Sequence, residues 1–206
     1  FAIRTVGSGV SEAAGLAVDD FNGDGSIDVG AASFGGDRVV WFESDGAGVP
    51  SFTARTAATS VVAATSIVSA DFDGDGDVDL AAMDDDLKEI RLLRNDGADP
   101  PTFLVQTIAM NVDPPTLLTP RSLFAADLEG DGDVDMLAAD VERERVVLLE
   151  NNGAGGFSTF QLTTAALAPD LPFGVTAADM DADGVAEVVL SNAASAAPGS
   201  LVLLDP

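Results

Sequence analysis

Apolar and polar positions alternate over short distances along the whole chain. Runs of about four apolar or small residues, such as 80–83 and 146–149, are separated by clusters of Asp, Asn, Gly and Ser. These runs are too short for helices of ordinary length, and turn-forming residues bound them, which is typical of short β-strands. We therefore expect an all-β protein.

The same order of segments repeats four times. Each repeat has a small apolar segment, an acidic loop and two further apolar segments. In the first three repeats an Asp-Gly or Asn-Gly turn and a strand led by Phe follow; we place the Phe-led strand of the third repeat at 160–163. Four strands in about 50 residues are typical of a β-propeller blade. We predict one repeat domain over residues 1–206, a β-propeller-like array of four four-stranded blades. The units are about 7–57, 58–109, 110–164, and 165–206 plus 1–6.

The last repeat has no Phe-led strand after its third apolar segment, 201–204. The first six residues, FAIRTV, resemble the fourth strand of the first repeat, residues 52–57 (FTARTA). We predict that this N-terminal strand completes the last blade. In cis it would close a ring and hide a sheet edge, and in trans it would link protomers into rings or filaments.

An acidic nine-residue loop separates the first two strands of every repeat. Positions 1, 3, 5 and 9 carry Asp, Asn or Glu in all four copies, and position 6 is always Gly. Oxygen ligands at this density suit calcium, which takes six to eight oxygens; position 7 can offer its backbone carbonyl, so its side chain can vary. We predict about four Ca²⁺ ions. The predicted ligands are Asp20, Asn22, Asp24, Ser26 and Asp28; Asp71, Asp73, Asp75, Asp77 and Asp79; Asp127, Glu129, Asp131, Asp133 and Asp135; and Asp179, Asp181, Asp183, Val185 and Glu187.

Two other interpretations explain the loops less well. Asp, Asn and Gly are ordinary turn formers, but turn formation alone does not require oxygen ligands at the same positions four times. An EF-hand has a bidentate acid at position 12 and flanking helices. The residues at position 12 are Ala31, Ala82, Ala138 and Leu190.

The charge and the residue types limit the function. The net charge is −26, from 35 acidic and 9 basic residues, which argues against binding to nucleic acid or to anionic membranes. No apolar run is long enough to insert into a bilayer. His, Cys and Tyr are absent, so we find no nucleophile–base pair and expect no enzyme activity. The acidic run 84–86 is expected to be a solvated turn.

The loops and their flanking strands resemble the FG-GAP/VCBS repeat family, in which an Asp-rich calcium loop joins two strands of a propeller blade. The second loop, from Asp71 to Asp79, is a close match. The fourth departs most, with Ala182 at position 4 and Glu187 at position 9, and the third has the longer Glu129 at position 3. The resemblance implies a propeller-type fold, usually of seven blades, in surface, secreted or matrix proteins.

We expect the calcium to be structural and the protein to be extracellular, because extracellular modules commonly bind calcium with a Kd of roughly 10⁻⁴–10⁻³ M. The expected function is a non-enzymatic adhesion or assembly module that binds a protein partner or itself, as a homo-oligomer or filament formed by strand donation. The alternative is a carbohydrate-binding lectin-type propeller. Sugar sites favour Trp and Tyr faces, but the single Trp, Trp41, lies in an apolar segment where core packing is expected.

Overall fold

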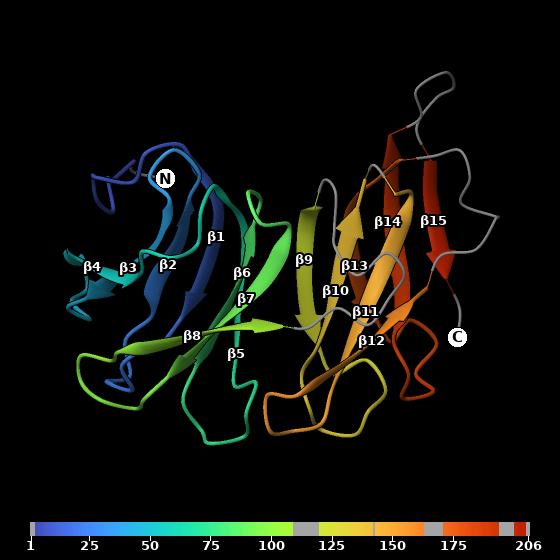
Figure 1. Cartoon of the computed structure of the whole chain (residues 1–206). Coiled ribbons are helices and arrows are strands. Elements are labelled where there is room, and N and C mark those ends of the chain that lie inside the picture. Colours follow the sequence, from blue (N-terminus) through green and yellow to red (C-terminus); the bar gives the residue numbers. More distant parts are fainter. Residues whose placement is uncertain (1–2, 109–119, 142, 163–170, 194–199, 205–206) are drawn as a thin grey trace. The chain divides into compact units, whose positions relative to one another are not determined.

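The computed structural model describes residues 3–108, 120–141, 143–162, 171–193 and 200–204. Within these ranges the chain is built from β-strands joined by turns (Figure 1). None of the described segments forms a helix that could cross a membrane. The strands are β1 (Ala13–Asp19), β2 (Asp28–Ser33), β3 (Arg38–Ser44), β4 (Phe52–Ala58), β5 (Ala64–Ala70), β6 (Asp79–Asp84), β7 (Glu89–Asn95), β8 (Phe103–Ile108), β9 (Pro120–Ala126), β10 (Asp135–Asp140), β11 (Arg145–Asn151), β12 (Phe157–Gln161), β13 (Leu171–Ala178), β14 (Glu187–Ala193) and β15 (Ser200–Leu204).

Consecutive strands form four separate sheets, one for each sequence repeat. Their orders are β1-β2-β3-β4, β5-β6-β7-β8, β9-β10-β11-β12 and β13-β14-β15. Neighbouring strands run antiparallel, as expected for strands joined by short turns. The prediction of an all-β, propeller-like array of blades is confirmed, and the described part of the last blade has three strands.

The chain divides into two compact units. Unit 1 comprises Phe1–Asp71 and Asp75–Thr107, and unit 2 comprises Phe72–Gly74 and Ile108–Pro206. Within each unit, the first strand of one sheet contacts the first strand of the next sheet, β1 with β5 and β9 with β13. The single repeat domain over residues 1–206 remains a prediction.

Aromatic side chains fill the core between the two sheets of unit 1. Phe21 and Trp41 meet edge to face, with ring centroids 6.1 Å apart. They pack with Ile67, Leu80 and Leu93. Trp41 is 1% exposed, which confirms its predicted place in the core.

Leucines take the corresponding places in unit 2. Leu148 lies opposite Leu137, as Trp41 lies opposite Gly30. Leu128 occupies loop position 2, as Phe21 does, and it joins a core with Val146 and Leu190. The core between the sheets of unit 2 is therefore built with smaller side chains.

One strand prediction is wrong, and the N-terminal strand stays a prediction. Residues 3–6 are in no strand, and Ile3 is fully exposed; the first two residues of the predicted N-terminal strand lie outside the described residues. In the third repeat, β12 begins at Phe157 and not at Phe160. Phe157 lies opposite Asn151, as Phe52 lies opposite Ser44. Two phenylalanines three residues apart made the sequence ambiguous, and strand register decides between them.

Candidate metal centres

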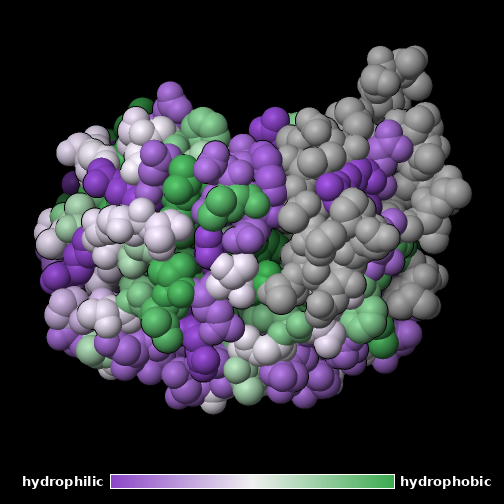
Figure 2. Space-filling view, in the orientation of Figure 1, coloured by the Kyte–Doolittle hydropathy of each residue, from purple (hydrophilic) through white to green (hydrophobic). Residues whose placement is uncertain are grey.

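Each acidic loop connects the first and second strands of its sheet. Within unit 1, the loops after β1 and β5 lie at the same end of their two sheets, and within unit 2 the loops after β9 and β13 lie at the same end of theirs (Figure 1). Hydrophilic residues are frequent on the surface at this end of unit 1 (Figure 2). Strand pairing places position 9 opposite the residue that precedes position 1, for example Asp28 opposite Asp19. Each loop is thereby closed into a compact turn.

The position 1 carboxylate organises the turn. In the first loop, Asp20 accepts hydrogen bonds from the backbone N–H groups of Asp24, at 3.1 Å, and Gly25, at 2.7 Å. The third and fourth loops repeat both bonds, and the second repeats the bond from position 6. Gly25 has a φ of 87°, a conformation that favours glycine. This explains why position 6 is always Gly.

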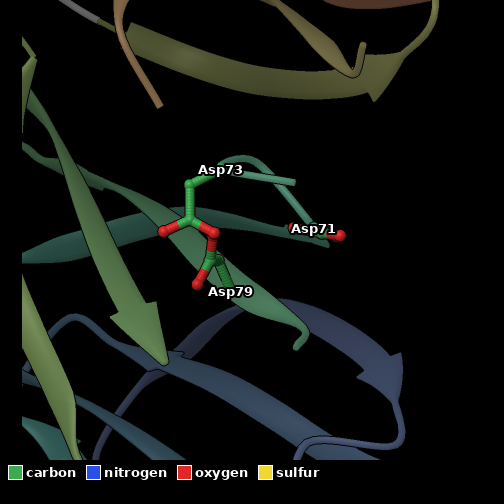
Figure 3. A group of neighbouring side chains, drawn as sticks. All are labelled: Asp71, Asp73 and Asp79. Atoms are coloured by element: carbon green, nitrogen blue, oxygen red, sulfur yellow. The ribbon is translucent and has the colours of Figure 1, made fainter. Parts of the chain in front are cut away.

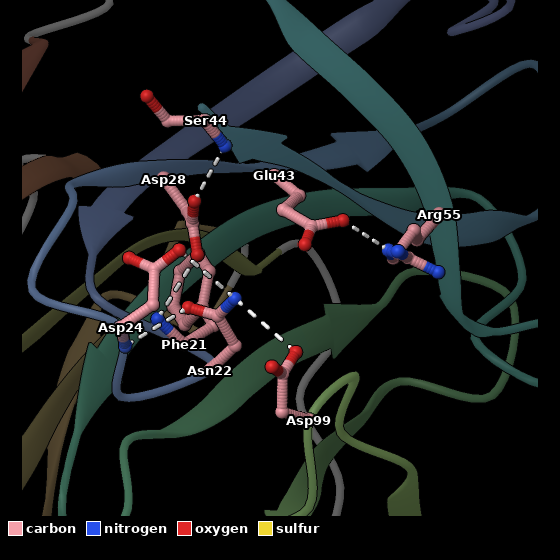
Figure 4. Close-up of polar contacts among 8 residues, drawn as sticks. All are labelled: Phe21, Asn22, Asp24, Asp28, Glu43, Ser44, Arg55 and Asp99. Carbon is pink, nitrogen blue, oxygen red and sulfur yellow. Dashed lines mark hydrogen bonds and ion pairs between the residues drawn. The ribbon is translucent and has the colours of Figure 1, made fainter. Parts of the chain in front are cut away.

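The position 9 carboxylate is buried in every loop. Asp28 accepts hydrogen bonds from the Phe21 N–H, at 3.2 Å, and the Ser44 N–H, at 2.7 Å (Figure 4). Burial raises the pKa of Asp28, and the nearby Asp24 and Asp20 carboxylates raise it further. Position 9 therefore ties the loop to the end of the third strand, in addition to facing the other loop carboxylates.

The other position 9 carboxylates also accept backbone N–H groups. Asp79 accepts a hydrogen bond from the Asn95 N–H. Asp135 accepts hydrogen bonds from the N–H groups of Leu128 and Asn151. Glu187 accepts a hydrogen bond from the Met180 N–H. The Asn95 side chain also donates from Nδ2 to the Phe21 carbonyl of the neighbouring first loop, at 2.8 Å. The sequence analysis missed these donors, although Ser44, Asn95 and Asn151 stand at the same place in their repeats.

Two loops bring three carboxylates together. The candidate ligand oxygens of Asp71, Asp73 and Asp79 lie within 4.8 Å of one another (Figure 3). Asp179, Asp181 and Glu187 form the same kind of group in the fourth loop. Oxygens bound to one Ca²⁺ ion at 2.3–2.6 Å are separated by up to about 5 Å, so these groups have the size of a calcium shell. The fourth loop forms this group although its sequence departs most from the family pattern.

The first and third loops differ at position 3. Asn22 donates from its amide to Asp24, at 3.3 Å, and to Asp99, at 3.5 Å (Figure 4). Asp99 lies in the turn after β7, and the sequence analysis did not associate it with this loop. In the third loop, Glu129 lines a cavity of unit 2. Within the described chain, neither loop contains a comparable group of three carboxylates.

Positions 5 and 7 form the outer part of each loop. The position 5 carboxylates (Asp24, Asp75, Asp131 and Asp183) are exposed and accept the N–H of position 7. The bond from Ser26 lowers the pKa of Asp24. The carboxylate of Asp77 lies against Gly97, where an added Cβ would come within 2.2 Å of it. The predicted ligation by the backbone carbonyls of Ser26, Asp77, Asp133 and Val185 remains a prediction.

Comparison with solved structures shows a related fold. The chain is similar to a lectin from Agrocybe aegerita whose structure explains its recognition of non-reducing terminal N-acetylglucosamine. The TM-score is 0.55 at 20% identity, over 89% of this chain and 50% of the lectin chain. The chain thus spans about half the length of that lectin, and the likeness concerns the fold. No curated protein matches the sequence.

The repeats themselves match a known family. Residues 20–82, 71–138 and 127–190 each match the FG-GAP-like repeat, and every matched segment begins at position 1 of an acidic loop. Together the three segments extend from residue 20 to residue 190. The chain therefore belongs to the FG-GAP-like repeat family.

Proposed function

We propose that this chain is a calcium-binding, non-enzymatic module of adhesion or assembly that works outside the cell. The observation that carries the proposal is the group formed by Asp71, Asp73 and Asp79, whose candidate ligand oxygens lie within 4.8 Å of one another. Carboxylates at this distance repel each other by roughly 1 kcal/mol per pair or more, even at a high effective dielectric constant. A bound divalent cation would convert this repulsion into attraction.

The backbone supports the same loop shape in all four copies. The bonds from position 6 to position 1 and from position 7 to position 5 recur in each loop. Four loops would hold about four ions and reduce the net charge from −26 to about −18. The loops connect strands of the scaffold, so we assign the calcium a structural role.

The proposed location follows from the affinity expected of such sites. With a Kd of roughly 10⁻⁴–10⁻³ M, each site would add about 0.4–1.4 kcal/mol of stability at millimolar calcium and almost nothing at cytosolic calcium. Folding stability totals roughly 5–15 kcal/mol for a typical domain. Several such sites therefore make a large difference where calcium is abundant, which is outside the cell.

Calorimetric titration of the chelator-treated chain with CaCl₂ tests the proposal. We expect about four ions per chain, with the free energy of unfolding rising as calcium is added. Magnesium should bind more weakly, because it requires near-octahedral geometry and dehydrates reluctantly. A chain that takes up no calcium at millimolar concentrations would refute the calcium function.

Glycan binding is the second candidate, and the fold shared with the lectin favours it. The burial of Trp41 removes the chain's one Trp from any sugar site. Phe34, Phe160 and Phe173 are exposed and could offer apolar faces to a sugar ring. Binding on a glycan array that is lost in Phe160→Ala or Phe173→Ala would support the lectin function, and an array without signal would reject it.

A further inference from the structure

Asn22 and Gly23 form an Asn-Gly pair in the first acidic loop. Asn22 stands at position 3, where the second and fourth loops carry Asp73 and Asp181. Gly23 is exposed, with a φ of 71°, and a Cβ added there would meet nothing within 4 Å. A glycine nitrogen has no side chain beside it to hinder attack, and asparagine amides are thermally labile. The pair is therefore open to a reaction between its own two residues.

The backbone N–H of Gly23 is not held by the loop. In the third and fourth loops, position 4 donates its N–H to the position 1 carboxylate, from Gly130 at 2.8 Å and from Ala182 at 2.6 Å. In the first loop, the position 1 carboxylate accepts the N–H groups of Asp24 and Gly25 instead. Within the described part of the chain, the Gly23 nitrogen makes no hydrogen bond that would have to break before it reacts.

We propose that Asn22 is a site of spontaneous deamidation. The Gly23 nitrogen attacks Cγ of Asn22, so that a new N–C bond forms and the Cγ–Nδ2 bond breaks. Water carries the Gly23 proton to the departing nitrogen, which leaves as ammonia. The Asp24 N–H donates to Oδ1 of Asn22, at 3.3 Å, and this is the atom on which negative charge develops during the attack.

Water then opens the cyclic imide in one of two ways. Attack at Cγ gives aspartate at position 22, and attack at the backbone carbonyl carbon gives isoaspartate, whose main chain is longer by one carbon. The net change is the uptake of one water and the loss of one ammonia. No oxidant, cofactor or enzyme is required.

A second Asn-Gly pair, Asn152-Gly153, lies in the turn after β11. There the amide oxygen accepts two N–H bonds, from Ala154 and Gly156, at 3.1 Å each. The carboxylate of Asp133 crowds Gly153, where an added Cβ would come within 2.6 Å of it. Turning the Asn152 amide toward the Gly153 nitrogen would break both hydrogen bonds. We therefore expect Asn152 to react more slowly than Asn22 in the folded chain.

The aspartate product would change the first metal centre. Asn22 donates from Nδ2 to the carboxylates of Asp24, at 3.3 Å, and Asp99, at 3.5 Å (Figure 4). A carboxylate in place of this amide would repel both of them, and it would give the loop acidic positions 1, 3 and 9, as in the second loop. Calcium affinity depends on the number of charged ligands. The converted loop should therefore be less stable without calcium and bind calcium more tightly.

This consequence rests on the calcium function proposed above, whereas the deamidation itself does not. Peptide mapping by mass spectrometry measures the deamidation in the unmodified chain, incubated with a chelator at mildly alkaline pH, either folded or in urea. Conversion raises the mass of a peptide by the difference between a hydroxyl and an amino group, and rearrangement of the Asp-Gly pairs leaves the mass unchanged.

In the folded chain, Asn22 should convert several-fold faster than Asn152. In urea the two should convert at similar rates, because only the shared dipeptide remains. Equal rates in the folded chain, or slower conversion of Asn22, would overturn the proposal.

Gly23→Ala tests the route. The added Cβ hinders the attacking nitrogen, so conversion of Asn22 should be largely lost, while Asn152 serves as the reference in the same sample. The fluorescence of Trp41, which packs against Phe21 of this loop, reports whether the variant is folded. Conversion of Asn22 at an unchanged rate would show that the Gly23 nitrogen is not the nucleophile and would contradict the proposal.

Asn22→Asp tests the consequence, and Asn152→Asp is the matched control that adds the same charge outside the acidic loops. In thermal unfolding followed by Trp41 fluorescence, Asn22→Asp should melt earlier than the unmodified chain in chelator and gain more from added CaCl₂. Asn152→Asp should do neither. An unchanged calcium response in Asn22→Asp would contradict the effect on the metal centre. No calcium response in any chain would refute the calcium function, and the mass measurement would still decide the deamidation.

Discussion

The carboxylate of Asp79 accepts a hydrogen bond of 2.7 Å from the backbone N–H of Asn95, sixteen residues further along the chain. Both residues are buried. The equivalent bonds Asp28–Ser44 and Asp135–Asn151 show that this is a property of the repeat. Position 9 therefore has a structural role that does not depend on an ion.

Replacing Asp79 should destabilise the chain even without calcium. Asp79→Ala leaves the buried Asn95 N–H without its acceptor, which costs about 1–3 kcal/mol. Asp79→Asn keeps one acceptor oxygen and should cost clearly less. Urea unfolding in the presence of a chelator measures both. Equal losses in the two variants would show that the charge of Asp79, and not its hydrogen bond, stabilises the fold.

Phe21→Ala should weaken the core of unit 1. The substitution removes the ring that meets Trp41 edge to face and leaves a void among buried side chains. Such truncations cost about 3–5 kcal/mol. Trp41 is the only Trp, so its fluorescence reports on this core directly during unfolding. Leu128→Ala, the matched change in unit 2, should leave that fluorescence signal largely unchanged. A comparable shift of the Trp41 transition in Leu128→Ala would contradict the separation of the two cores.

Ala182→Gly should stabilise the fourth loop. Position 4 has a φ of 71–75° at Gly23, Gly74 and Gly130, and Ala182 is held at 66°. A residue with a Cβ pays roughly 1–2 kcal/mol in this conformation. The variant should gain stability by up to that amount in chelator, measured by thermal unfolding. Gly23→Ala is the reciprocal test, because an added Cβ would meet nothing within 4 Å, and it should lose a similar amount. No change in either variant would show that position 4 is not strained.

Asp45 and Asp96 should give stability that depends on pH. Hydrogen bonds from Ser51 and from Thr102 lower the pKa of Asp45 and of Asp96, respectively, from the ordinary value of 3.8. A carboxyl group whose pKa is lower in the folded chain than in the unfolded chain stabilises the fold above pH 3.8. This stability is lost as the pH falls through the pKa of the folded chain. Asp45→Asn should therefore be less stable than the unmodified chain at neutral pH.

The difference should shrink as the pH falls below 3.8, where Asp45 itself becomes protonated. Asn152, at the same turn of the third sheet, accepts N–H bonds from Ala154 and Gly156 at 3.1 Å, so the substitution preserves the turn. Melting temperatures measured across this range test the prediction. A difference that is constant with pH would contradict it.

Sequence reasoning succeeded where local chemistry determines structure. The repeat length, the acidic loops and the turn glycines predicted the blades, and Gly46, Gly97 and Gly153 have the positive φ that Asp-Gly and Asn-Gly turns favour. It failed where neighbouring strands decide the outcome. The choice of Phe157 over Phe160 depends on register with β11, and three of the donors to position 9 come from the third strand of the sheet.

Asn95 joins the first two acidic loops. Its backbone N–H holds Asp79, and its side-chain amide holds the Phe21 carbonyl. An ion that orders the second loop would also fix the Asn95 side-chain amide, which donates to the first loop. The first loop would then have lost part of its conformational entropy before the next ion binds. Under the proposed calcium function, the two loops of unit 1 are thermodynamically linked, and they should fill with positive cooperativity over a narrower range of calcium concentration than two independent sites.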